Sequence, residues 1–432
     1  NKKGNTSWVG GNNNWNQVCH GGMIAAAIVT ADTDMELAAR TIGRALDGMP
    51  NALVAYGPDG VYPEGSTYWG YGTSFTVFTA AMFESAFGTD FGLAEFPALM
   101  ESADFRVLCN APSGWYYNFA DCGDKRSEKG DITLAWFATK TGNTAFFEKE
   151  RFLTAPENMG KLGRLDAAGL VWVSQFETRE TAKTPLAWKG DGDNPIVIFK
   201  AEDNDPSQYY FGGKGGRGTV NHGNMDGGSF IFELNGVRWV VDPGNQHYHT
   251  LEKAGFDLWG KNQGSQRWTL LTKNNYGHST LTVNNQLHKV DGKAIFTDFK
   301  VGENPEATLD LSATFEGQLE SAHRRFLKES ATSLLIEDKI VVNDATQMVT
   351  WQLMTVADVE VVKGGAILRQ DGKTLKLENL SHPKISVSVI SLDPAPLALD
   401  RQIENLKRLE LRIPAYLFDA NGSTLKIRLS ES

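Results

Sequence analysis

Four polar side chains flank a short segment with the pattern of a β-hairpin, and their types are those that move protons or bind ions. His222, Asn224 and Asp226 come just before this segment, and Asp242 closes it. An antiparallel pair places its start and finish side by side, so we expect these side chains to be neighbours. The hairpin would then present an imidazole, an amide and two carboxylates at one rim. The alternative is a set of turn-forming residues beside a surface histidine.

The hairpin itself is predicted by its turn. Ser229–Leu234 and Val237–Val241 are runs of β-branched and aromatic residues joined by Asn235-Gly236. This dipeptide accepts the positive φ angles that a type I′ turn requires.

Composition sets limits on the class of protein. The 432 residues are 41% hydrophobic and 22% charged, as in an ordinary globular protein long enough for two or three domains. No apolar run approaches the roughly 20 residues of a membrane helix, so we expect no membrane partner. The net charge of −10 argues against nucleic acid and is awkward for any polyanionic ligand, which would need a local basic cleft.

Three cysteines, Cys19, Cys109 and Cys122, cannot form a disulfide framework. A bridge between Cys109 and Cys122 is conceivable, but small buried thiols are the favoured interpretation. The first residues are polar and rich in Gly and Asn, and lead directly into a helical pattern without a secretory signal. We therefore expect upstream helices, supplied by another fragment of the same protein, to be missing from this chain.

The first part of the chain predicts helical hairpins joined by Gly-, Asn- and Pro-rich loops. Two helices are expected between Gln17 and Met49, divided near Asp32–Asp34. Further helices are expected at residues 73–86, 92–105, 132–139 and 145–153, with Gly142-Asn143 as a turn. The connecting loops are expected to carry the aromatic and polar residues Tyr62, Glu64, Tyr68, Trp69, Tyr71, Trp115 and Tyr116. Helices with functional loops at one end suggest an α/α toroid.

After Pro185 the hydrophobic period changes to that of strands. Residues 195–200 are strand-like, and alternation continues at 333–342, 349–356, 385–392, 408–415 and 423–430. Asp371-Gly372 and Asn421-Gly422 mark turns. The fold class expected is α+β: a partial toroid at residues 1–175, whose N-terminal helices are absent, followed by an antiparallel β-sandwich at residues 176–432.

Four tracts in order resemble the heparinase II/III-like polysaccharide lyases. They are NNNWNQV, DGVYPEGSTYWGYG, NHGNMDGGSFIFELNGVRWVVDPGNQHYH and RWTLLTKNNYGHSTLTV. The resemblance covers the chain from Trp8 to about Phe299. In that family a toroid precedes antiparallel sheets, and the chemistry is β-elimination at uronic acids. This reaction needs a group that neutralises the substrate carboxylate, a base for the C5 proton and an acid for the leaving oxygen.

The resemblance implies roles for residues of the helical part. Asn14 matches the position that faces the substrate carboxylate, and Gln17 adds a hydrogen bond; a helix N-cap is the alternative for Asn14. Tyr68 matches the catalytic tyrosine, with Tyr71 as the other candidate, and either could instead be a sugar platform. Glu64 and Trp115 are expected to contact substrate.

In the β part, the resemblance implies that His222 neutralises the carboxylate or shares in proton transfer. Tyr248 matches a second tyrosine near the leaving group. Arg267 is a candidate for a bidentate contact with sulfate or carboxylate, or else forms a structural salt bridge.

Several members of the family hold zinc with two histidines and an aspartate. Asp242 and His278 match two of these positions, but Asn224 stands at the third, and amide oxygen is a poor zinc ligand. The resemblance thus implies a structural divalent metal, zinc or a harder cation, that is weakly held or absent. No organic cofactor is expected. A metal-free hydrogen bond between Asp242 and His278 is the alternative.

The expected function is cleavage of a uronic-acid-containing glycan to unsaturated products, with heparin or heparan sulfate as first substrate. Alginate or another uronate polymer is the next candidate, and a non-catalytic carbohydrate-binding protein of the same fold is the alternative from another class. A glycoside hydrolase would need paired carboxylates, for which Glu64 is the one obvious candidate. The family resemblance implies a periplasmic or secreted location.

Overall fold

The computed structural model describes residues 6–125, 131–147, 166–179, 181 and 183–431. The chain divides into two compact units. The first, which we name the helical unit, comprises residues 1–110 and 125–185; the second, the β unit, comprises residues 111–124 and 186–432. Residues 111–124 lie with the strands although they come from the middle of the helical part of the sequence.

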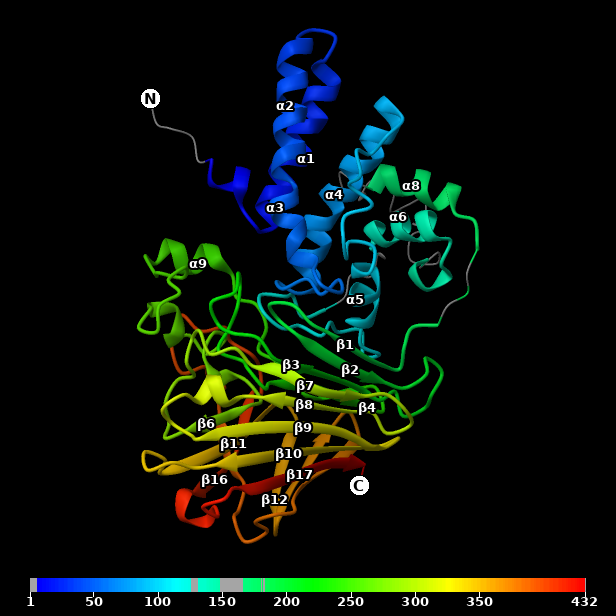
Figure 1. Ribbon diagram of the computed structural model, residues 1–432. Coiled ribbons are helices and arrows are strands. Elements are labelled where there is room, and N and C mark those ends of the chain that lie inside the picture. The colour runs from blue at the N-terminus through cyan, green and yellow to red at the C-terminus, as the bar shows by residue number, and fades with distance from the viewer. Residues whose placement is uncertain (1–5, 126–130, 148–165, 180, 182, 432) are drawn as a thin grey trace. The chain divides into compact units, whose positions relative to one another are not determined.

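The helical unit is built from helical hairpins, as the apolar spacing predicts. Figure 1 shows α1 and α2 lying side by side, and α4 also packs on α1. The Asp34 side chain accepts the backbone N–H of Leu37 and caps α2, so the expected break near Asp32–Asp34 is confirmed. The helices are η1 Ser7–Gly10, α1 Asn14–Thr30, α2 Met35–Gly48, α3 Pro50–Leu53, η2 Val54–Tyr56, α4 Ser66–Phe87, α5 Ser102–Leu108, α6 Ile132–Thr141, η3 Thr144–Phe146 and α8 Asp166–Gln175.

Two expectations for this unit are wrong. Residues 92–101 form successive turns, and α5 begins at Ser102, because Pro97 lacks an N–H and Ala98 has a positive φ of 64°. Tyr68, Trp69 and Tyr71 lie on the first turns of α4, not in a loop, because Gly65 ends the preceding turn with a φ of 85°.

The last expected helix of this unit is only partly described. The structure has the short helix η3 where residues 145–153 were expected to be helical. Residues 148–153 of that range lie outside the described residues. Gly142 does end α6 in the left-handed conformation, as its turn role predicts.

The β unit contains three antiparallel sheets, which confirms the expected α+β class. The sheet orders are β1-β2-β3-β4-β5, β12-β13-β14-β17-β10-β9-β8-β7 and β15-β16-β11-β6. The strands are β1 Ala187–Gly190, β2 Ile196–Lys200, β3 Tyr210–Lys214, β4 Phe230–Leu234, β5 Val237–Val240, β6 Leu281–Val283, β7 Ile295–Lys300, β8 Glu306–Asp310, β9 Ser321–Ser330, β10 Ser333–Val341, β11 Met348–Thr355, β12 Asp358–Val362, β13 Gly365–Gln370, β14 Lys373–Asn379, β15 Ser388–Ser391, β16 Lys407–Pro414 and β17 Ser423–Glu431. The short helices are α9 Tyr248–Lys253, η5 Gln266–Thr269, η6 Asn275–Gly277, η7 Ser312–Phe315 and η8 Ala415–Leu417.

One hydrophobic core joins the three sheets. The ring of Phe211 on β3 lies 4.8 Å from that of Phe326 on β9, and Phe230 on β4 lies 6.5 Å from Trp351 on β11. All four rings are buried in the same cluster. Alternation along the strands sends these apolar residues inward, and the facing sheets pack as a sandwich.

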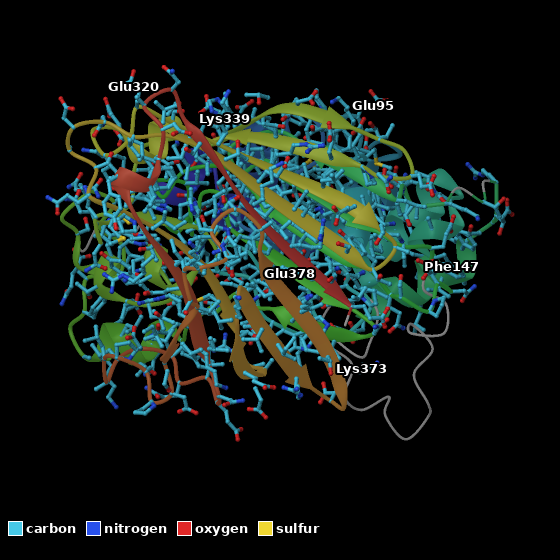
Figure 2. The ribbon with its side chains drawn as sticks, turned by 90° about the horizontal axis from the view of Figure 1, so that it is seen from below. Glu95, Phe147, Glu320, Lys339, Lys373 and Glu378 are labelled. Atoms are coloured by element: carbon cyan, nitrogen blue, oxygen red, sulfur yellow. The ribbon has the colours of Figure 1, made fainter. Side chains whose placement is uncertain are left out.

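The other face of the eight-stranded sheet is covered with charged residues. Arg325 on β9 pairs with Glu306 on β8 and with Glu337 on β10, and Lys426 on β17 also pairs with Glu337. Figure 2 shows this sheet with its side chains, including Glu378 and Lys339. These residues alternate along the strands with the apolar residues that point into the core, which gives the sheet one charged face and one apolar face.

The three cysteines are free thiols. Cys109 and Cys122 are buried and Cys19 is partly buried, so the bridge between Cys109 and Cys122 that the sequence left open is not formed. Among the described residues, no helix has the length and apolar character needed to cross a membrane.

Candidate functional site

In the helical unit, the two polar residues expected at the substrate carboxylate touch each other. Asn14 is the first residue of α1, and its Nδ2 donates to Glu64 Oε2 at 2.5 Å. Both side chains are 1% exposed. The helix is capped by Asn13, whose side chain accepts the N–H of Trp15. The N-cap alternative for Asn14 is therefore wrong, and Glu64 fixes the orientation of its amide.

Gln17, one turn further along α1, is fully buried in a polar cluster. Its Nε2 donates to the Tyr56 hydroxyl at 2.8 Å and to Thr76 Oγ1 at 3.0 Å, while its Oε1 accepts from the Tyr62 hydroxyl at 3.2 Å. Burial, followed by the charge of Glu64, raises the pKa of Tyr62 well above its usual value. These contacts favour a structural role for Gln17 behind Asn14 over the expected contact with substrate.

The two candidate tyrosines, Tyr68 and Tyr71, are both partly exposed. Tyr68 is close enough to Tyr62 to influence its ionisation, which places it beside the cluster of Asn14 and Glu64. The Tyr71 ring meets the exposed ring of Trp15 edge to face at 6.4 Å. The geometry thus links Tyr68 to the polar cluster and Tyr71 to an aromatic surface.

In the β unit, four residues that are distant in sequence form a hydrogen-bonded cluster. The Tyr248 hydroxyl donates to Asp121 Oδ2 at 2.6 Å, and His222 Nδ1 lies 2.9 Å from the same oxygen. The Tyr248 hydroxyl and His222 Nδ1 are themselves 2.9 Å apart. The ammonium of Lys273 binds the other oxygen, Asp121 Oδ1. His222 and Tyr248, which the family resemblance selected separately, are therefore direct partners.

The loop that carries His222 is held by backbone contacts. The N–H of Gly223 donates to Val220 O, and a side chain at Gly223 would meet Gly218 O at 2.9 Å, so only glycine fits this turn. Arg267 donates from Nη2 to Gly223 O at 2.7 Å and is 1% exposed. These contacts favour Arg267 as a support for the loop over the expected sulfate ligand.

An exposed aromatic ring lies against this pair. Trp259 is 48% exposed, and its ring centroid lies 5.8 Å from that of His222 and 5.1 Å from that of Tyr248. Its Nε1 donates to Glu252 at 3.0 Å, which fixes the ring. A fixed, solvent-facing indole is suited to stacking on the apolar face of a sugar.

The remaining expected ligand, Trp115, belongs to the β unit and not to the loops of the helical part. It is partly exposed, and the guanidinium of Arg238 lies 5.4 Å from its ring. Its segment is held to the hairpin by Glu233, which accepts from the N–H of Ser113 at 3.0 Å and from its hydroxyl at 2.6 Å. The buried Glu233 explains why residues 111–124 join the β unit.

Asp242 and His278 meet directly, with Asp242 Oδ2 2.9 Å from His278 Nδ1. Three buried polar atoms have no hydrogen-bond partner among the residues that the structure describes: His278 Nε2, Asn224 Oδ1 and Asp226 Oδ2. Within the described residues, no group of three His, Cys, Asp or Glu side chains is arranged to hold a metal. One imidazole, one carboxylate and one amide fit zinc poorly, so no step of the chemistry is assigned to a metal.

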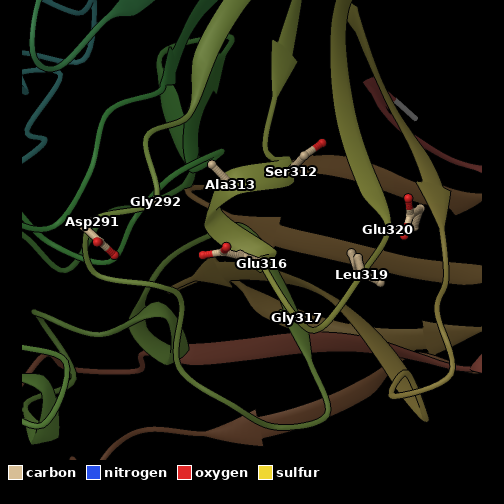
Figure 3. Close-up of a pocket in the computed structure, with 8 residues that line it drawn as sticks. All are labelled: Asp291, Gly292, Ser312, Ala313, Glu316, Gly317, Leu319 and Glu320. Carbon is tan, nitrogen blue, oxygen red and sulfur yellow. The ribbon is translucent and has the colours of Figure 1, made fainter.

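Two surface pockets of the β unit are lined by residues other than Asp121, His222 and Tyr248. One, of about 430 Å³, is lined by η7 and a neighbouring loop, and Figure 3 shows Asp291 and Glu316 at one side of it. A second, of about 440 Å³, lies beside the start of α9. There Arg401 already pairs with Asp124 and donates to Pro243 O and Asn245 O, so its charge is balanced.

Sequence reasoning missed Asp121 and Lys273. Asp121 lies 101 residues from His222 and 152 from Lys273. No motif marks Asp121, and the tract that contains Lys273 does not indicate its contact with Asp121. Asn14 and Tyr68 belong to the helical unit, whereas His222 and Tyr248 belong to the β unit. That these four act in one cleft stays a prediction.

Comparison with known proteins identifies the β unit. Residues 210–407 match the family described as Heparinase II/III-like, C-terminal. No curated protein matches the chain.

Solved structures show the same fold over the whole chain. A heparan sulfate lyase HepC mutant from Pedobacter heparinus has a TM-score of 0.67 at 13% identity, with 100% of this chain and 60% of that chain covered. A structure of heparinase III has a TM-score of 0.65 at 11% identity, with 98% of this chain and 61% of that chain covered. The chain thus spans about three fifths of the length of these proteins, and at such identity the likeness is one of fold. The resemblance found in the sequence is confirmed for residues 210–407, which match the model of the heparinase II/III-like C-terminal domain.

Proposed function

We propose that this protein is a polysaccharide lyase that cleaves a uronic-acid-containing glycan by β-elimination, with heparan sulfate or heparin as its first substrate. The observation that carries the proposal is the contact of Tyr248 and His222, both within the heparinase-like residues 210–407, with each other and with Asp121. A phenol and an imidazole within hydrogen-bond reach can pass a proton between them.

The base takes the C5 proton of the uronate, and the electron pair of the C5–H bond forms the C4–C5 double bond as the C4–O bond breaks. The electron pair of the C4–O bond leaves on the departing oxygen, which takes a proton. We assign Tyr248 to the protonation of this oxygen and His222 to the proton exchange that restores the phenol. Either step is general acid–base catalysis of the kind that histidine and tyrosine supply.

Two groups of the helical unit complete the proposed set. Asn14, oriented by Glu64, would hydrogen-bond the substrate carboxylate and lower its charge, which makes the C5 proton easier to remove. Tyr68 would be the base. This part of the proposal is supported by the motif in which each residue stands.

Substrate binding draws on aromatic and basic groups of the β unit. Trp259 would stack on a sugar ring next to His222 and Tyr248. Lys261, whose Nζ donates to Asn221 Oδ1 at 3.0 Å, places a cation next to the His222 loop and would attract sulfate or carboxylate. Such local charge offsets the net charge of −10. Because the substrate is a large polyanion, we infer periplasmic or secreted action.

A structural metal remains part of the proposal only as a weakly held ion near Asp242, His278 and Asn224. The glycoside hydrolase alternative receives little support, because Glu64 is 1% exposed and bound to Asn14. A non-catalytic carbohydrate-binding role is the alternative that the test must separate.

The test is a scan of the purified protein over heparan sulfate, heparin, alginate and an unsulfated uronate polymer. Ultraviolet absorbance of the unsaturated uronate is followed with time. We expect the fastest rise with heparan sulfate or heparin. A rise only with alginate would change the substrate, and binding without any absorbance change on all polymers would indicate a carbohydrate-binding protein.

A further inference from the structure

We propose that Asp121 is the positioning residue of the site: it holds His222 in the tautomer that carries its proton on Nδ1, and holds the Tyr248 hydroxyl beside it. The role in turnover rests on the proposed function, whereas the tautomer does not. Asp121 lies outside the four tracts that carry the family resemblance.

The geometry that carries this inference is a triangle of three polar atoms. Asp121 Oδ2 lies 2.6 Å from the Tyr248 hydroxyl and 2.9 Å from His222 Nδ1, and those two atoms are 2.9 Å apart. Asp121 is 1% exposed. A buried carboxylate oxygen with two close neighbours needs hydrogen-bond donors from them.

Only one arrangement of hydrogen-bond protons satisfies all three contacts. The Tyr248 hydroxyl has one proton to donate. If it donated that proton to His222 Nδ1, Asp121 Oδ2 would face both atoms with no proton in either contact, which is repulsive. If instead Tyr248 donates to Asp121, then Nδ1 must also carry a proton, which it shares between the carboxylate and the phenolic oxygen. The neutral imidazole then has its lone pair on Nε2.

Asp121 can act in this way because it stays ionised. Burial disfavours the charged form, but the Lys273 ammonium, together with the hydrogen bond and charge of His222, outweighs burial and holds the pKa of Asp121 far below its usual range. Lys273 is itself unexposed, so the pair is a fixed ion pair and not a solvated one. A carboxylate in this position also stabilises the imidazolium that forms when Nε2 accepts a proton.

The backbone beside Asp121 and at His222 has unusual conformations. Ala120, just before Asp121, has a φ of 56°, and His222 has a φ of 55°. Left-handed residues other than glycine cost free energy and persist where the surroundings hold them, commonly at functional sites. Both segments that form the contact thus carry local strain, which agrees with a geometry kept for function.

Nitrogen-15 NMR of protein labelled at histidine tests the inference, because the two imidazole nitrogens report the tautomer directly. His222→Gln identifies the His222 signals by their loss. In the unaltered protein we expect protonated Nδ1 and unprotonated Nε2 under conditions in which His222 is neutral. A His222 signal with its proton on Nε2 would overturn the proposal without need of any variant at Asp121.

Asp121→Asn is the informative variant, because it keeps the shape and removes the charge. Its amide can donate to Nδ1, which would move the proton to Nε2 and leave the ring in the other tautomer. Asp124→Asn is the matched control: it lies in the same segment, but its carboxylate pairs with Arg401. We expect the tautomer to change in the first variant and to stay in the second. An unchanged tautomer in folded Asp121→Asn would contradict the role.

Turnover supplies the second readout. Asp121→Asn should lower kcat by about 10²–10⁴ with little change in KM, since the carboxylate acts through His222 and Tyr248 and not on substrate. Asp124→Asn should keep kcat within a few-fold. If no polymer is cleaved but the tautomer behaves as stated, the proposed function fails and the positioning role stands. If cleavage is normal in Asp121→Asn, the positioning role fails alone.

Discussion

At the scale of single residues, the residues of the proposed function are held by specific partners within each unit. Asn14 is oriented by Glu64, and Tyr248 and His222 are oriented by Asp121. Sequence motifs select Asn14, Tyr68, His222 and Tyr248 because each stands in a recognisable tract. They do not select Glu64 as the partner of Asn14, Lys273 as the partner of Asp121, or Asp121 at all, because those contacts join positions 50 to 152 residues apart.

The assignment of Tyr68 leads to the first prediction. Tyr68→Phe keeps the ring and removes only the hydroxyl, so folding should be almost unchanged while kcat falls by about 10²–10⁴. Steady-state kinetics and a thermal melt measure both effects. Tyr71→Phe is the matched control on the next turn of α4. Near-full activity in Tyr68→Phe, with loss in Tyr71→Phe, would move the base to Tyr71.

The second prediction concerns Asn224, which stands where the family resemblance implies a zinc-binding histidine. An imidazole is a far better zinc ligand than an amide, and its loss should weaken binding by more than the roughly 10- to 100-fold typical of groups that only support a ligand. We expect less than one metal ion per chain by elemental analysis and activity that survives chelation. Asn224→His should raise Tm in added zinc, whereas Asn224→Gln should not. One tightly held zinc, with activity lost on chelation, would contradict this.

At the scale of elements, the hairpin follows from local sequence alone. Asn235 and Gly236 have φ angles of 57° and 76°, as the type I′ turn requires, and β4 and β5 begin and end within a residue of the expected runs. The helices α1, α2 and α6 likewise follow from the local spacing of apolar residues, and the start of α2 follows from its cap near Asp32–Asp34. Residues 92–101 were not, since Ala and Leu suit a helix in composition while Pro97 and the turn at Ala98 exclude it.

The placement of residues 111–124 could not come from local pattern either. It depends on the buried contacts of Glu233 with Ser113 and of Arg238 with the backbone of Tyr116. Both contacts join positions more than a hundred residues apart, where periodicity carries no information. The same segment delivers Asp121 to the site, so the missed element and the missed residue have one cause.

The turn supplies a prediction at this scale. Gly236→Ala should lower the free energy of unfolding by about 1–2 kcal/mol, because the left-handed conformation is costly for a residue with a side chain. Asn235→Gly is the control and should change it by less than about 0.5 kcal/mol. Denaturant titration of the three proteins compares them. Equal stability of Gly236→Ala and the parent protein would show that the turn can relax into another type.

At the scale of the whole molecule, acid sensitivity should come from a buried neutral histidine. His288 is 1% exposed, and its Nε2 contacts Leu281 O at 2.8 Å. Its Nδ1 has no hydrogen-bond partner in the described part of the chain. Burial, which disfavours the charged form, lowers the pKa of His288 to about 4. The unfolded chain therefore binds this proton near pH 6.5 and the folded chain only near pH 4.

The neutral imidazole of His288 contributes to the free energy of unfolding in full above pH 6.5. This contribution is lost as the pH falls toward 4, and the loss reaches on the order of 3 kcal/mol. His288→Gln keeps a donor for Leu281 O and cannot titrate, so its Tm should fall less than that of the parent protein between pH 7 and pH 5. His323→Gln, at a partly exposed position, should follow the parent curve. Parallel curves for all three would rule out His288 as the source.

The central claim is that the glycan is cut by elimination and not by hydrolysis, and water enriched in ¹⁸O tests it most directly. Heparan sulfate is digested in this water by the unaltered protein and by Tyr248→Phe. Mass spectrometry then measures the masses of the resulting oligosaccharides. Elimination adds no water across the cleaved bond, so we predict fragments lighter than hydrolysis products by one water, without ¹⁸O from cleavage. Tyr248→Phe should yield the same products far more slowly. Saturated fragments that each carry one ¹⁸O would contradict the account.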